Sequence, residues 1–142
     1  MQSGAFRSVV AGFAFALLFV VPAAAQMVNL KADLKGSEEV PPLDVKGSGQ
    51  VTATFDPASK TLTWKGTITG LTAPPTMAHF HGPAPAGKNA GVVVPIPNPG
   101  PTFEGKITLT EGQVTDMMAG MWYVNIHTAA HPSGELRGQL TK

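Results

Sequence analysis

The chain has 142 residues, no cysteine, and nearly balanced charges, with ten Lys and Arg residues against nine Asp and Glu. This length fits a single domain, and the lack of cysteine excludes both disulfides and thiolate metal ligands. Balanced charge is not typical of a nucleic-acid-binding protein, which carries a basic patch or stripe. We therefore expect one domain that is stabilised by its hydrophobic core and does not bind nucleic acid.

Residues 1–25 have the pattern of a secretory signal peptide. Arg7 provides a positive charge, the run from Val9 to Val21 is apolar, and three alanines precede Gln26 as a small-residue cleavage site. The apolar run is shorter than the roughly 20 residues of a membrane-spanning helix. We predict cleavage before Gln26, which leaves a 117-residue domain, 26–142, that is periplasmic or secreted and free of the membrane. A retained anchor is the alternative.

Alternation of apolar and polar residues predicts antiparallel strands with one buried and one solvated face. The clearest examples are residues 50–55, 61–68, 102–109, 122–127 and 135–140. Asp56-Pro57-Ala58-Ser59 predicts a hairpin turn between the first two. About seven short strands with turn signals between them favour an all-β fold, an antiparallel Greek-key sandwich of the immunoglobulin type.

One short helix is predicted after Thr110. Gln113 follows this capping residue by three positions, as in a capping box. Gly120 marks the end of the helix, because glycine accepts the left-handed conformation found there. The apolar residues of this segment recur at helical spacing: Val114, Met117, Met118 and Met121.

Proline and glycine predict three irregular segments. Pro83–Gly91 and Pro95–Pro101 are too rich in these residues to be central strands. We expect the first to be a loop that follows the strand around His79. The segment Gly36–Gly49, which contains Pro41-Pro42, is expected to be an extended edge or a connection.

The four histidines of the chain fall into two short motifs, His79-Phe80-His81 and His127-Thr128-Ala129-Ala130-His131. Residues two apart in a strand point to the same face, and the alternation places His79, His81 and His127 opposite the core. If the two strands are neighbours, their side chains are about 5 Å apart. We predict a surface metal site formed by these three histidines, with His131 returning from a loop as the fourth ligand.

The ligand types favour copper. Four neutral imidazoles without a thiolate suit copper(II), which stands at the top of the divalent affinity series. Zinc is the less favoured alternative, because structural zinc sites usually contain cysteine, and a hydrolytic site needs a carboxylate base. Glu135 is the only acidic residue close to the motifs in sequence. Met77 lies on the face of His79, where its thioether either binds copper(I) or is merely packed or solvated.

Several stretches resemble the CHRD domain family, which is named for the repeats of chordin, an extracellular binder of growth factors. The likeness spans residues 30–140, and its motifs are Lys35-Gly36-Ser37-Glu38-Glu39-Val40-Pro41-Pro42, Ala78-His79-Phe80-His81-Gly82-Pro83-Ala84, Tyr123-Val124-Asn125-Ile126-His127-Thr128 and Pro132-Ser133-Gly134-Glu135-Leu136-Arg137-Gly138-Gln139-Leu140. The resemblance implies an exported single-domain protein. In the last motif, Glu135 and Arg137 share a strand face and are expected to pair.

A looser similarity concerns the site. Copper/zinc superoxide dismutases also hold copper on an antiparallel sandwich with a His-x-His pair. This chain has no histidines for a separate zinc site and no cysteines for the usual disulfide. The similarity would therefore imply a copper-only dismutase.

We expect a periplasmic copper protein whose most plausible reaction is superoxide dismutation, with Arg137 as the cation that attracts superoxide. Two alternatives remain open at this point. One is non-catalytic copper storage, delivery or tolerance, and the other is a metal-free structural or protein-interaction domain. The sequence does not indicate an oligomeric state.

Overall fold

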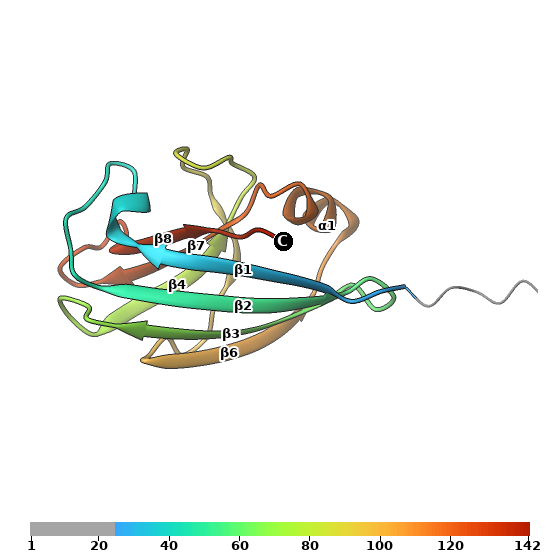
Figure 1. Cartoon of the computed structure of the whole chain (residues 1–142), viewed down its shortest axis with the longest axis horizontal. Coiled ribbons are helices and arrows are strands. Elements are labelled where there is room, and N and C mark those ends of the chain that lie inside the picture. Colours follow the sequence, from blue (N-terminus) through green and yellow to red (C-terminus); the bar gives the residue numbers. More distant parts are fainter. Residues whose placement is uncertain (1–24) are drawn as a thin grey trace, which may run out of the picture.

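Eight strands and one α-helix make up residues 25–142, the part of the chain that this computed structural model describes (Figure 1). The elements are β1 (Val28–Lys35), β2 (Ser48–Asp56), β3 (Thr61–Thr69), β4 (Pro75–His81), β5 (Val92–Pro95), β6 (Thr102–Thr108), α1 (Glu111–Met118), β7 (Tyr123–Thr128) and β8 (Leu136–Gln139), with a short 3-10 helix, η1, at Gly36–Glu38. The predicted signal peptide falls almost wholly on residues 1–24, which lie outside this part.

The strands form one antiparallel sheet in the order β5-β4-β7-β8-β1-β2-β3-β6. The sheet curls, so that β1, β2, β3 and β6 lie side by side in one layer and β4 and β7 lie behind them (Figure 1). Trp64 of β3 and Phe80 of β4 pack edge to face across the interior, with ring centroids 5.2 Å apart. The predicted all-β, sandwich-like fold with one short helix is therefore confirmed.

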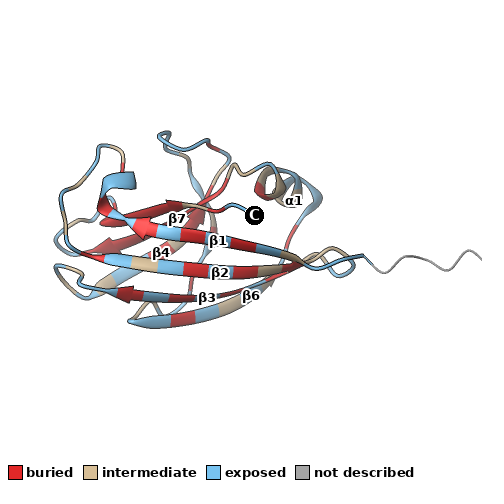
Figure 2. Ribbon diagram, in the orientation of Figure 1, coloured by how far each residue is buried: buried red, intermediate tan, exposed pale blue. Residues whose placement is uncertain are grey.

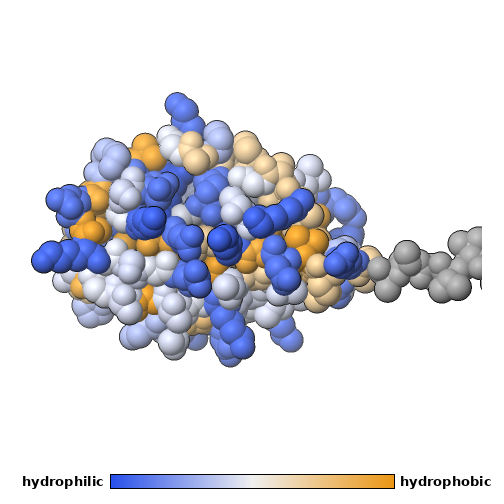
Figure 3. All heavy atoms as spheres, in the orientation of Figure 1, coloured by the Kyte–Doolittle hydropathy of each residue, from blue (hydrophilic) through white to orange (hydrophobic). Residues whose placement is uncertain are grey.

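The core lies between the two layers and is built from alternate residues of the strands. In β3, for example, Leu62, Trp64 and Ile68 are buried whereas Thr63, Lys65 and Thr67 are exposed. Figure 3 shows hydrophilic side chains spread over the outer face of the front layer. Burying the inner face of such strands stabilises the fold by roughly 25 cal/mol for each Å² of apolar surface.

The predicted strands at 50–55, 61–68 and 102–109 correspond to β2, β3 and β6. The predicted turn also forms, because the Asp56 carboxylate accepts hydrogen bonds from the Ala58 amide at 2.9 Å and the Ser59 hydroxyl at 2.7 Å. β1 is absent from the predicted strands, although Leu30, Ala32 and Leu34 alternate and are buried. It pairs with β2 and β8 and so joins the two halves of the sheet.

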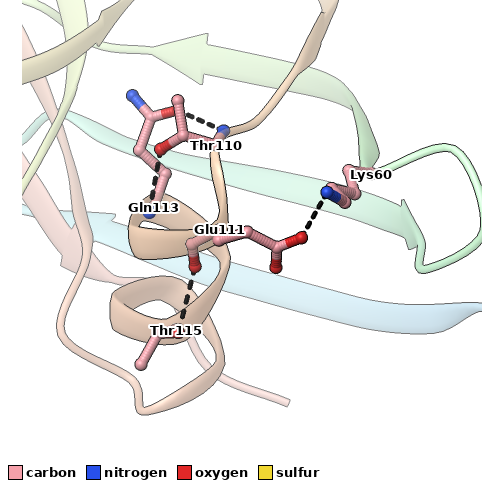
Figure 4. Close-up of polar contacts among 5 residues, drawn as sticks. All are labelled: Lys60, Thr110, Glu111, Gln113 and Thr115. Carbon is pink, nitrogen blue, oxygen red and sulfur yellow. Dashed lines mark hydrogen bonds and ion pairs between the residues drawn. The ribbon is translucent and has the colours of Figure 1, made fainter.

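The capping box forms as predicted at the start of α1 (Figure 4). The Thr110 hydroxyl accepts from the Gln113 amide at 3.3 Å, and the Gln113 side chain accepts from the Thr110 amide at 2.9 Å. Gly120 follows the helix with a φ of +74°, the left-handed conformation expected there. Glu111 forms an exposed ion pair with Lys60, which ties the helix to the turn before β3.

The outer face of β7 and of the adjoining end of β4 is largely covered rather than solvated. Every residue of β7 is buried, on both faces of the strand (Figure 2). The predicted loop at Pro83–Gly91 follows β4 and lies over this face, as does the connection after β1 that contains Glu39. Within residues 25–142, no helix is long and apolar enough to span a membrane.

Candidate metal centre

Three of the four histidines meet on the outer face of β4 and β7. His79 and His81 come from β4 and His127 from β7, and one ring nitrogen from each lies within 4.8 Å of the others. The antiparallel register places His79 opposite Asn125 and His81 opposite Tyr123, so that all these side chains share one face. Alternation of side chains in two neighbouring strands is therefore sufficient to bring the three rings together.

Backbone carbonyls orient two of these rings. His81 Nδ1 lies 3.0 Å from the Ala90 carbonyl oxygen, and His127 Nδ1 lies 2.9 Å from that of Pro132. A carbonyl can only accept, so Nδ1 carries the proton in both neutral rings and the lone pair is on Nε2. This is the arrangement of metal-binding histidines, in which the second ring nitrogen donates to a carbonyl or carboxylate.

The third ring meets one of these lone pairs. His79 Nδ1 lies 3.2 Å from His127 Nε2 and donates a hydrogen bond to it when no ion is bound. Two nitrogens this close could both bind one ion through bonds of about 2.0–2.1 Å.

Burial favours the neutral form of His79 and His81. It lowers the pKa of His79 and His81, because charged imidazolium loses its hydration there, and the neighbouring histidines lower these pKa values further. The Ala90 hydrogen bond acts in the opposite direction on His81. Neutral imidazole is the form that binds metal, so the rings need little deprotonation near pH 7.

One atom of the cluster has no partner within the protein. His81 Nε2 is buried without a hydrogen bond, and a buried polar atom in that state costs about 1–3 kcal/mol. A bound cation would satisfy this nitrogen and replace the His79–His127 hydrogen bond with two metal–nitrogen bonds. The three residues therefore fit a transition-metal ion by the type, tautomer and closeness of their donor atoms.

The structure does not bring His131 into this cluster. Its backbone amide donates to the Thr128 hydroxyl at 3.1 Å and closes the turn after β7. The His131 side chain instead lines a neighbouring pocket, with Glu39 and Ser133. The group of mutually close ligand atoms thus has three members, and His131, the predicted fourth ligand, is not among them.

The description of the site as a surface site is also wrong. His79 is partly exposed, but His81 is only 8% and His127 only 7% exposed. The alternation placed them correctly opposite the hydrophobic core. The loops that cover this face, however, depend on contacts between distant segments, which alternation within a strand does not reveal.

Arg137, the predicted catalytic cation, is buried behind the cluster. It is 2% exposed, and its guanidinium carbon lies 3.5 Å from the centre of the Tyr123 ring. That ring in turn stacks on His81, with centroids 4.9 Å apart and planes 3° from parallel. The guanidinium also donates to Asn89 Oδ1 at 2.8 Å and to the Lys88 carbonyl oxygen, so Arg137 positions the loop that holds His81.

The expected pair between Glu135 and Arg137 does not form. The Glu135 carboxylate accepts from the Thr72 amide at 2.8 Å and from the Thr72 and Thr128 hydroxyls at 2.7 and 2.6 Å. Burial alone would raise the pKa of Glu135, but these hydrogen bonds outweigh it and hold the pKa below its ordinary value. The carboxylate is therefore used to join β7 to the segment before β4.

Glu39 also lies beside the cluster, although it is not among the predicted site residues. This residue follows η1 and accepts a hydrogen bond from Asn125 on β7, between the positions of Tyr123 and His127. It lines a cavity of about 220 Å³ together with His81, Asn125 and His131. Burial raises the pKa of Glu39 to about 7, against the smaller opposing effects of Asn125 and Arg137. In the sequence, Glu39 is marked only by its place in the first motif that resembles the CHRD domain family.

The fold and the cluster define a class of protein, a small antiparallel β-domain that carries a partly buried three-histidine centre. The model of the CHRD domain matches residues 30–140, and the chain therefore belongs to the CHRD domain family. Searches among curated proteins and among solved structures gave no match. The family assignment thus extends over the described domain and includes every histidine.

Proposed function

We propose that the protein binds one copper ion through His79, His81 and His127. The observation that carries this proposal is the orientation of the two covered rings. The Nδ1 atoms of His81 and His127 donate hydrogen bonds to backbone carbonyl oxygens. The Nε2 atom of His81 has no hydrogen-bond partner in the protein. All three donors are imidazoles, which late transition metals accept as ligands in the neutral form.

Copper is favoured over zinc by the donor set. All three donors are imidazoles, and a given nitrogen site binds copper(II) more tightly than the other divalent ions of the first row. Zinc also accepts three histidines and a water, so it is the competitor. A hydrolytic zinc site would need a carboxylate base. Glu39 is the carboxylate beside the cluster, but it accepts a hydrogen bond from Asn125 instead.

Elemental analysis and copper(II) spin-resonance spectroscopy test the proposal. The purified protein should hold one copper ion, with nitrogen hyperfine structure from three imidazoles. His79→Ala should remove this signal, whereas His131→Ala should preserve it. Binding of zinc alone from an equimolar mixture, or no binding of either metal, would count against copper.

Superoxide dismutation is the reaction we propose for the loaded site. A bound copper ion would supply one-electron chemistry, in which one superoxide is oxidised to dioxygen and a second, with two protons from solvent, is reduced to hydrogen peroxide. Three protein ligands leave a coordination position open, and His79 is the ring that solvent reaches. Arg137 lends positive charge from behind Tyr123, but its burial keeps it from touching the substrate.

Copper storage, delivery or tolerance without catalysis is the second candidate. It is favoured by the burial of His81 and His127 beneath loops, which restricts access to the ion. Superoxide consumption well above that of free copper and of the His79→Ala variant would support the enzyme. A growth defect confined to excess copper, with no superoxide consumption, would support the second candidate instead.

We further propose that the domain acts in the periplasm or outside the cell, because the first 25 residues have the pattern of a cleaved leader. The chain contains no cysteine, so a histidine centre would not depend on the redox state of thiols in an oxidising compartment. Fractionation of expressing cells and N-terminal sequencing of the product test this proposal. The product should be outside the cytoplasm, and its first residue should be Gln26.

A further inference from the structure

We propose that Met77 is a fourth, soft donor to the three-histidine centre, and that the centre takes up monovalent copper or silver past its thioether. This inference rests on the proposed metal site and adds the class of ion that enters it. It depends on where Met77 lies in the sheet and on its unusual exposure for a large apolar residue.

The register places Met77 beside two of the three ligands. Met77 is directly opposite His127 in the antiparallel pairing of β4 and β7. It also precedes His79 by two residues in β4, so it points to the same face. Side chains of directly opposed residues begin about 5 Å apart, which is within reach of a flexible thioether.

The pairing is irregular at this point. A shift between Pro75 and Met77 breaks the register of β4 with β7, and the Thr76 hydroxyl donates to the carbonyl oxygen of His127 at 3.3 Å. Bulges of this kind redirect side chains and are common beside functional sites. Met77 thus stands at the point where the regular pairing next to the cluster ends.

Met77 is not needed for packing. It is 49% exposed, whereas Met117 of α1 is buried in the core. An exposed methionine gains little free energy from burial, but a thioether is a donor that selects copper(I). His79, the most exposed ring of the cluster, lies on the same strand and face, so both residues border solvent.

Protein groups cover much of the rest of the cluster. Tyr123 stacks on His81, and the segment at Ala90 covers that ring through bonds to its Nδ1 and to the Tyr123 hydroxyl. The Pro132 turn covers His127. Apart from the cavity that His81 lines, the edge bordered by His79 and Met77 is the exposed side of the cluster. An ion that enters along this edge meets the thioether before it reaches the buried nitrogens.

Carbon-13 NMR of the methionine methyl groups tests the inference with silver(I), a diamagnetic probe for copper(I). One equivalent of silver(I) should shift the methyl resonance of Met77 together with the ring resonances of the three histidines. Met27, which is 52% exposed at the start of the described chain, is the matched control and should not shift at that ratio.

Two variants extend the test. Met77→Leu should weaken silver(I) and copper(I) binding by about tenfold and change copper(II) binding by less than about twofold, whereas Met27→Leu should change neither. Histidine shifts without a Met77 shift would overturn the inference and leave the histidine site intact. If neither residue type responds and copper(II) is not bound, the proposed function itself fails.

Discussion

The Nδ1 atom of His127 lies 2.9 Å from the carbonyl oxygen of Pro132, five residues further along the chain. This contact fixes the tautomer of the ring and turns its Nε2 toward His79. The turn after β7 therefore orients the His127 ring through its backbone, without a contribution from the His131 side chain. In the proposed copper site the two histidines of the second motif would have different roles, which mutation can separate.

We expect His79→Ala, His81→Ala and His127→Ala each to weaken copper(II) binding by about 100-fold or more, because each removes one donor. His131→Ala should retain the affinity within about twofold, since its ring lies outside the cluster. Competition titrations with a chelator of known affinity measure these changes. An equally large loss of copper(II) affinity in His131→Ala would support a site with four histidine ligands.

The buried carboxyl of Glu39 should make stability depend on pH. Its pKa is raised from 4.5 to about 7 in the folded protein, so the folded state holds the proton more tightly than the unfolded state. Its contribution is fully present below pH 4.5 and is lost as the pH rises from there through 7. We expect a loss of about 1–2 kcal/mol, after allowance for solvent screening.

Glu39→Gln keeps the shape of this side chain and removes its titration. The difference in unfolding free energy between the variant and the wild type, measured in urea without metal, should therefore shift in favour of the variant between pH 4.5 and 7. Comparing the two proteins cancels the contribution of the histidines, whose lowered pKa values destabilise the fold as the pH falls. A difference that is constant with pH would contradict the assignment.

Arg137 should contribute to the stability of the fold more than to a reaction at the site. Arg137→Met removes the stack on Tyr123 and the bonds to Asn89 and Lys88, and we expect a loss of about 2–4 kcal/mol. Arg137→Lys should recover part of this loss, because a lysine retains the charge but not the planar contacts. Urea unfolding measures both. Full stability in Arg137→Met would show that the loop is held by other contacts.

A methyl group at Gly134 should disturb the cover of the histidine face. The residue has a φ of +131°, and an added Cβ would lie 2.5 Å from Asn125 Nδ2 and 2.6 Å from Glu39 Oε1. We expect Gly134→Ala to destabilise the fold by about 1–3 kcal/mol. Gly112→Ala is the control, because a Cβ there meets nothing within 4 Å and alanine favours the helix; it should be neutral or stabilising. Equal effects of the two changes would refute this.

Much of the architecture follows from local patterns. Alternation in β2, β3 and β6, the Asp56 turn and the Thr110 capping box depend on neighbouring residues, so the sequence is sufficient to predict them. The same alternation places three histidines on one face. β1 obeys the same rule, since Leu30, Ala32 and Leu34 alternate and are buried, although it is not among the predicted strands.

The parts that could not be predicted depend on contacts between distant residues. Glu39 reaches Asn125 across 86 residues of chain, and Arg137 reaches Asn89 across 48. No period within a strand indicates that such loops will cover a face that alternation marks as solvated. Glu135 was expected to pair with a residue two positions away, but hydroxyl and amide donors from Thr72 and Thr128 occupy its carboxylate instead.

Carbonyl oxygens from two separate loops hold the rings of His81 and His127 before any ion arrives. The conformational entropy of these side chains is thus lost during folding rather than during coordination. If copper binds as proposed, the two rings held in this way need little reorganisation, which favours fast capture of the ion and fast electron exchange. A small domain without a single thiol can in this way present preorganised imidazole nitrogens.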